Sequence, residues 1–144
     1  MKRLPLLLIL SFAGCSQSWQ ITHSFAVGAA CIAYVGNPMI QTDYKLVSEL
    51  QNNTLQHYRH ELVYSGTAGG TMKILYREYS IYGLRPAFNQ ELQYDTISKR
   101  ITFRDYRIDV LEATNEHIRF VVVSAPASGT QQEQEKAKGP KHSR

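Results

Sequence analysis

Arginine and tyrosine alternate in one short stretch of this chain in a way that could bind an anion or a sugar. The stretch is Tyr76-Arg77-Glu78-Tyr79, and Arg85 follows it in a longer connection. A guanidinium can hold a carboxylate or phosphate through two parallel hydrogen bonds, and a tyrosine ring combines an apolar face with a polar tip. The pattern indicates a candidate ligand-binding site at Tyr76, Arg77, Tyr79 and Arg85. The simpler alternative is an exposed Arg77–Glu78 pair with tyrosines that pack the sheet, and such pairs contribute little.

Other candidate chemistry in the chain is weaker. His57 and His60 are three residues apart, which suits a shared metal on a helix but puts the two side chains on opposite faces of a strand. The glycine cluster at 66–70 lacks the Gly-Lys-Ser/Thr ending of a phosphate-binding loop and suits a hairpin connection. The chain contains neither Gly-x-Ser-x-Gly nor Ser-x-x-Lys. We therefore expect no catalytic residues, no metal site and no enzyme.

Nine tyrosines are present in the chain. A row of tyrosines on one sheet face could stack on sugars, such as the glycan of peptidoglycan. Tyrosine is also a good strand former with a polar tip, and we expect most of the nine to have that structural role.

The N-terminal residues have the composition of a secretory signal. Met1-Lys2-Arg3 is a positive start, and the run from Leu4 to Ala13 is apolar. This run is too short to span a bilayer, which needs roughly 20 apolar residues. We expect residues 1–14 to be a signal peptide that is removed.

Phe12-Ala13-Gly14-Cys15 resembles the lipobox of bacterial lipoproteins. The resemblance implies that the Cys15 thiol takes a diacylglycerol, that the signal is cut just before Cys15, and that the new amine is acylated, as by palmitate. Phe12 departs from the aliphatic residue usual there, and the resemblance covers residues 1–15 alone. The residue after Cys15 is Ser16 and not Asp, and by resemblance to the sorting rule of Gram-negative lipoproteins this implies anchoring in the outer membrane, with the protein facing the periplasm. No cofactor is expected besides this lipid.

An ordinary signal cleaved near Ala13 is the alternative, and it would give a soluble secreted or periplasmic protein. Cys15 could then pair with Cys31 in a disulfide, since an exported protein meets an oxidising compartment. With Cys15 lipidated, Cys31 lies in an apolar run and is expected to be a small buried hydrophobe.

The formal net charge of +4 belongs to the two ends of the chain. Residues 15–130 hold ten Lys or Arg and ten Asp or Glu, so this part is neutral. A nucleic-acid-binding domain carries a basic patch of its own, so no nucleic-acid partner is expected. The composition predicts a tether at 15–26, a folded domain at 27–124 and a disordered basic tail at 125–144.

Within 27–124 the apolar pattern has a period of two residues, which is typical of strands. Alternation at 58–64 and 72–77 predicts a hairpin with a long glycine-rich connection at 65–71. Further strands are expected at 27–35, at 40–48, between the turns at 95–98 and 113–116, and at 118–122, while 45–53 could also form a helix. The pattern predicts an all-β fold, a small antiparallel β-sandwich or partly open barrel of about seven to eight strands.

These features together predict a lipid-anchored cell-envelope protein with a structural or protein-interaction role. Its expected contacts are the membrane, through the lipid, and an envelope protein or peptidoglycan. The alternative function is a periplasmic ligand-binding module for a glycan, a lipid or a small anion.

Overall fold

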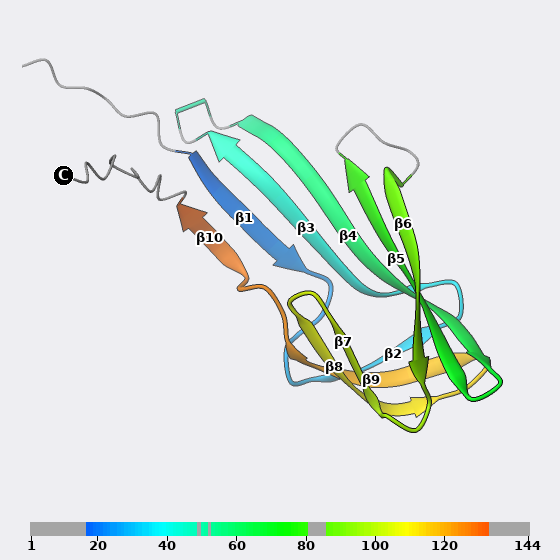
Figure 1. Cartoon of the computed structure of the whole chain (residues 1–144). Helices are drawn as coiled ribbons and strands as arrows, with labels where there is room; N and C mark the ends of the chain where they lie inside the picture. The colour runs from blue at the N-terminus through cyan, green and yellow to red at the C-terminus, as the bar shows by residue number, and fades with distance from the viewer. Residues whose placement is uncertain (1–16, 49, 52, 81–85, 133–144) are drawn as a thin grey trace, which may run out of the picture.

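The computed structural model describes residues 17–48, 50–51, 53–80 and 86–132, and these residues form two antiparallel β-sheets (Figure 1). The large sheet consists, in spatial order, of β10 (Gly129–Gln132), β1 (Gln17–His23), β3 (Pro38–Ser48), β4 (Asn53–Ala68), β5 (Thr71–Ser80) and β6 (Phe88–Asp95). The small sheet consists of β2 (Ala30–Tyr34), β9 (His117–Ser124), β8 (Tyr106–Ala113) and β7 (Arg100–Phe103). In this part of the chain no helix has the length and apolar character needed to cross a membrane.

The two sheets face each other across one apolar core, so the predicted all-β sandwich is confirmed. Eight strands, β2 to β9, lie within 27–124, in agreement with the prediction of about seven to eight. Both sheets are open among the described residues, so they do not close into a barrel. The helix considered for 45–53 is also not formed, because β3 continues to Ser48 and β4 begins at Asn53.

β4 and β5 form the predicted hairpin, but their connection is much shorter than expected. Strand pairing continues to Ala68 and Thr71, so only Gly69 and Gly70 form the turn. Their φ angles are +57° and +80°, the left-handed values that a two-residue hairpin turn requires and that glycine adopts at little cost. The register shifts between Tyr64 and Thr67, so the first part of the predicted connection is a bulge within the strands.

The predicted tether at 15–26 contains a strand of the large sheet. β1 pairs with β3 along its whole length, and Ser18 and Ile21 are buried in it. Isolated apolar residues in a polar segment had indicated a tether. They lie at alternate positions and face one side of the sheet, so the folded domain begins earlier than predicted.

The predicted tail at 125–144 also begins with structure. β10 pairs with β1, from Ser18 opposite Gln132 to Ile21 opposite Gly129. A polar strand can form here because its backbone hydrogen bonds are supplied by a neighbour that is already fixed in the sheet. Residues 133–144 lie outside the described residues.

The small sheet covers only one end of the large sheet. In β4 the residues from Glu61 to Tyr64 are all buried, whereas those from Asn53 to Gln56 are all exposed. β1, β3 and the first half of β4 extend beyond the small sheet (Figure 1). We call this uncovered part, residues 17–23, 43–48 and 53–60, the overhang.

Candidate functional site

A row of polar side chains marks the border between the covered core and the overhang. His23, Thr42, His60 and Glu78 are opposite one another on β1, β3, β4 and β5. From the small sheet, the Tyr106 hydroxyl donates a hydrogen bond of 2.7 Å to Thr42 Oγ1. Thr42 Oγ1 also lies 2.9 Å from His23 Nδ1. No buried side-chain nitrogen or oxygen of the described residues lacks a hydrogen-bond partner, so the apolar core ends here without unpaired groups.

Arg104, in the turn between β7 and β8, attaches the small sheet to this border. Its Nη1 donates to Glu78 Oε1 at 2.8 Å and to the Tyr76 hydroxyl at 2.5 Å. Its guanidinium carbon lies 4.5 Å from the centre of the Tyr76 ring and 5.5 Å from that of Phe103. Charge, hydrogen bonds and ring contact therefore converge on one side chain.

The protonation states along the border follow from these contacts. The hydrogen bond from Tyr76, with the bond and charge of Arg104, lowers the pKa of the Glu78 carboxyl despite its partial burial. Burial lowers the pKa of the His60 imidazole, and this effect outweighs the opposing charge of Glu78. Burial and the bond to Glu78 raise the pKa of the Tyr76 hydroxyl. At neutral pH the border thus holds an ionised Glu78 and a neutral His60.

Beyond the border, the inner face of the overhang carries an open hollow of about 350 Å³. Its walls are mostly apolar and aromatic, and we call them the aromatic surface: Trp19, Ile21, Tyr44, Tyr58 and His60. All five side chains project to the same side, because the register places Ile21, Tyr44 and Tyr58 opposite one another. An amphipathic surface of this kind suits a ligand with both apolar and hydroxyl groups.

The rings of the aromatic surface lean toward one another. The ring centres of Trp19 and Tyr58 are 6.3 Å apart with planes at 29°, although the two residues lie on β1 and β4, with β3 between them. Leu46 lies on that intervening strand and is only 8% exposed. The Tyr44 and His60 rings are 4.8 Å apart. The surface is therefore a packed layer with one side open, and Tyr58 remains 41% exposed.

The structure separates the three described residues of the ligand site that the sequence indicated. Tyr76 is fully buried on the inner face, whereas Arg77 and Tyr79, at odd positions of the same strand, point to the outer face. Arg85 and Cys15 lie outside the described residues. In the simpler alternative, Tyr76 does pack in the core, but Glu78 pairs with Arg104 and not with Arg77, because neighbours in a strand face opposite ways.

His57 and His60 lie on opposite faces, as their spacing in a strand predicted. On the outer face, His57 Nε2 and Arg59 Nε lie 2.7 and 2.9 Å from Asp43 Oδ1. Burial alone would raise the pKa of the Asp43 carboxyl, but the bonds from His57 and Arg59 bring it below its ordinary value. Within the described ranges, no three His, Cys, Asp or Glu side chains gather as a metal site would require.

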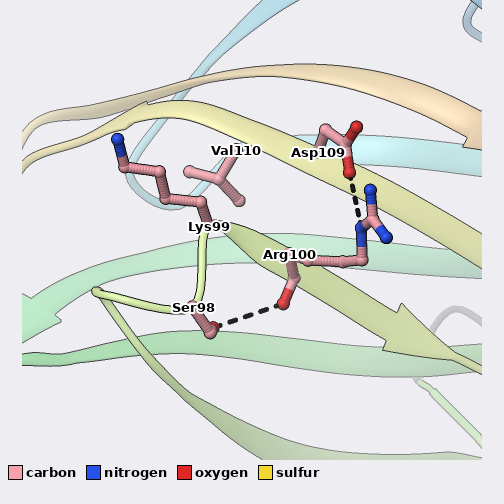
Figure 2. A pocket seen from close by; sticks show the side chains of 5 residues that line it. All are labelled: Ser98, Lys99, Arg100, Asp109 and Val110. Carbon is pink, nitrogen blue, oxygen red and sulfur yellow. Dashed lines mark hydrogen bonds and ion pairs between the residues drawn. The ribbon is translucent and has the colours of Figure 1, made fainter.

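A second hollow, of about 360 Å³, lies over β7 and β8 and is mainly polar. Figure 2 shows the Arg100 side chain turned toward Asp109 on the neighbouring strand. Arg100 Nε donates to Asp109 Oδ1 at 2.7 Å, and the Ser98 hydroxyl donates to the Arg100 carbonyl oxygen at 3.5 Å. The charges of Arg100 and Asp109 neutralise each other. The residues that line this hollow therefore form an ordinary cross-strand ion pair rather than a ligand site.

The edge of the small sheet offers a different kind of surface. β2 is an edge strand whose residues, Ala30-Cys31-Ile32-Ala33-Tyr34, include no charge, and Ile32 and Tyr34 are 52% and 58% exposed. Cys31 packs against the core, as expected of a small hydrophobe, but it is half-buried rather than buried. The other edges differ, since β6 and β7 contain charged residues and β10 is polar. We call residues 30–34 the β2 edge.

No protein-family model, curated protein or solved structure matches this chain. A function must therefore be inferred from its own surfaces. Among the described residues, the aromatic surface gathers aromatic side chains around an open hollow, and the β2 edge combines exposed apolar side chains with an edge strand.

Sequence reasoning missed the aromatic surface because it assigned Trp19 and Ile21 to a tether. Their spacing of two residues was the available signal, since Tyr58 and His60 have the same spacing in the predicted hairpin. What the sequence could not show is that the second sheet stops short of these residues.

Proposed function

We propose that this protein is a lipid-anchored protein of the bacterial cell envelope whose role is to dock another envelope protein. The anchor is the lipid expected on Cys15, through the resemblance of Phe12–Cys15 to a lipobox. The expected location is the outer membrane, with the domain in the periplasm.

The observation that carries the docking role is the β2 edge. Natural sheets protect their edges with charges, proline or bulges, because an unpaired strand can pair with another chain. β2 has none of these charges, and its exposed Ile32 and Tyr34 add apolar contacts to the free backbone. A partner strand added here would gain backbone hydrogen bonds and would also bury both side chains.

The position of the β2 edge supports this role. β2 belongs to the small sheet, at the end of the molecule remote from the start of β1 (Figure 1). A lipid on Cys15 would hold the start of β1 near the membrane, so the β2 edge would face the periplasm.

Ile32→Lys tests the proposal in cells, with a photo-crosslinking residue at Tyr34. We expect a repeatable partner for the wild-type protein and an approximately tenfold weaker crosslink for Ile32→Lys, because a charge would be buried in the added strand. Ile97→Lys is the matched control, since Ile97 is 83% exposed in a turn away from the β2 edge. Equal crosslinking in Ile32→Lys and Ile97→Lys would contradict the docking role.

The intact mass of the mature protein tests the anchor in the same cells. A chain that starts at Cys15 and carries diacylglycerol and acyl groups supports it, and Cys15→Ala should leave the membrane fraction. An unmodified soluble chain would remove the lipid from the proposal and leave the β2 edge to be judged by its crosslinks.

A ligand-binding module is the second candidate function, and the aromatic surface favours it. The Trp19 and Tyr58 rings present apolar faces beside the hydroxyl groups of Tyr44 and Tyr58. A pyranose ring has the matching combination of an apolar face and hydroxyl groups, so a glycan is the soluble ligand that fits best.

A further inference from the structure

We propose that the overhang is seated on the membrane that holds the lipid of Cys15, with Trp19, Leu50, Leu55 and Tyr58 in the headgroup region. The proposal depends on the lipid anchor of the proposed function. It adds a second, non-covalent contact between the folded domain and the bilayer.

The first observation is the short distance along the chain from the lipid to the sheet. β1 begins at Gln17, two residues after Cys15. Two residues span at most about 7 Å. The start of β1 is therefore held at the membrane surface, and no flexible linker separates the domain from the bilayer as the predicted tether would have done.

The second observation is the set of residues that share this end of the sheet. The register places Gln17 opposite Ser48, and Ser48 opposite Asn53, so the connection between β3 and β4 lies at the same end. Leu50, in that connection, is 68% exposed, and Leu55, at the start of β4, is 40% exposed. Leucines exposed at the end nearest the lipid are the side chains that a bilayer would bury.

The aromatic residues add the chemistry of a membrane interface. Trp19 and Tyr58 lie close to this end, with their rings 6.3 Å apart and Tyr58 41% exposed. Tryptophan and tyrosine are enriched at membrane–water interfaces, where the ring body is buried and the polar tip is hydrated.

The charge of the C-terminal segment matches a lipid surface. β10 runs antiparallel to β1, with Gln132 opposite Ser18, so the chain leaves the sheet at the end where β1 begins. Residues 133–144 contain two Glu, then three Lys and one Arg, a net charge of +2. Basic residues next to a membrane anchor are attracted to anionic headgroups.

These observations favour the membrane over a soluble glycan as the occupant. A glycan on the aromatic surface would contact the rings but would have no need of Leu50 or of the net charge of +2 in residues 133–144. The membrane accounts for the leucines, the aromatic rings and the charge together, and the anchor brings it within reach.

The chain contains one tryptophan, so the emission of Trp19 reports on this surface alone. The full-length lipidated protein is reconstituted in vesicles of phosphatidylcholine and phosphatidylglycerol. We expect lipids with brominated acyl chains to quench the emission of Trp19 in the wild-type protein. Aqueous iodide should quench this emission about fivefold less in the wild-type protein than in the double variant Leu50→Asp/Leu55→Asp. That double variant stays anchored through its lipid, and the thermal midpoint verifies its fold.

Ile97→Asp is the control, because it places one aspartate, against two in the double variant, on an 83% exposed residue in the turn beside Gly70, at the far end of the molecule. It should leave the quenching of Trp19 unchanged. The membrane seat would be overturned if iodide quenched Trp19 as strongly in the anchored wild-type protein as in the double variant. A blue shift that needs added peptidoglycan fragments and occurs without bromolipid quenching would also overturn it, and would identify a glycan instead. A mass without lipid on Cys15 would show that the anchor itself is wrong.

Discussion

Arg104 holds the border of the core through contacts that no other single side chain in the described residues makes. It is one of two non-glycine residues there with a positive φ, +50°, a conformation that costs about 1 kcal/mol or more. The strain is offset by the ion pair with Glu78 and the contact with the Tyr76 ring. The β7–β8 turn thus contacts the large sheet at the border of the overhang.

Glu78→Gln should flatten the dependence of stability on pH. The pKa of the Glu78 carboxyl is lower in the folded protein than its ordinary value of 4.5. Its ionisation therefore stabilises the fold above that pH, and this contribution is lost as pH falls through the folded-state pKa. Urea unfolding between neutral and acid pH measures the effect, with an expected loss of about 1 kcal/mol at neutral pH.

Glu91→Gln is the control for Glu78→Gln. Glu91 lies on β6, and its Oε1 is 3.9 Å from Lys73 Nζ in an exposed pair. The Glu91→Gln substitution should leave both the free energy of unfolding and its pH dependence nearly unchanged. Asp43, whose pKa is also lowered, keeps part of the slope in both variants. An acid-induced loss in Glu78→Gln as steep as in the wild-type protein would contradict the role of the border.

Among the elements, the strands in which apolar and polar residues alternate clearly could be predicted from the sequence. The strands that form only because a neighbouring strand pairs with them could not. The hairpin of β4 and β5 was predicted because its residues alternate for many positions. β1 and β10 were missed, since one is short and mostly polar and the other contains no apolar residue. β1 and β10 are strands because they pair with other strands. Their pairing with each other joins residues more than a hundred positions apart, so it leaves no pattern in the local sequence.

The lack of a local signal for strand pairing also explains why the candidate site was not predicted correctly. Tyr76, Arg77 and Tyr79 are close in sequence, but a strand sends Arg77 and Tyr79 to one face and Tyr76 to the other. The aromatic surface joins residues from β1, β3 and β4, which only the register of the sheet brings together.

Gly70→Ala should destabilise the β4–β5 hairpin by about 1 kcal/mol. Gly70 has a φ of +80°, and a Cβ added there meets nothing within 4 Å, so the cost comes from the backbone alone. Gly70→Asn should lose less, because asparagine tolerates the left-handed region better than alanine. Urea unfolding of the three proteins checks the order, and equal losses for Ala and Asn would argue against a strained turn.

The whole molecule is a sandwich at one end and a single sheet at the other. The core holds the small sheet against the end of the large sheet that is remote from Gln17, and the overhang is left with one open face. In the proposed arrangement the membrane covers that open face and the β2 edge points away from it. The two apolar surfaces then have different occupants because they lie on different sheets, at different ends of the molecule.

Amide hydrogen exchange should reveal this division within the single hairpin of β3 and β4. Amides of Leu62 and Tyr64, under the small sheet, should exchange only through global unfolding, whereas paired amides at Thr54 and Tyr58 should exchange through local opening of the overhang. The difference should be about tenfold or more in rate, since local opening breaks few apolar contacts. In anionic vesicles the lipidated protein should show slower exchange at Thr54 and Tyr58 and no change at Leu62, because the bilayer adds contacts only to the open end. Equal protection along the hairpin in solution would mean that the overhang is as firmly held as the core. The overhang would then have no apolar surface left for the membrane to bury.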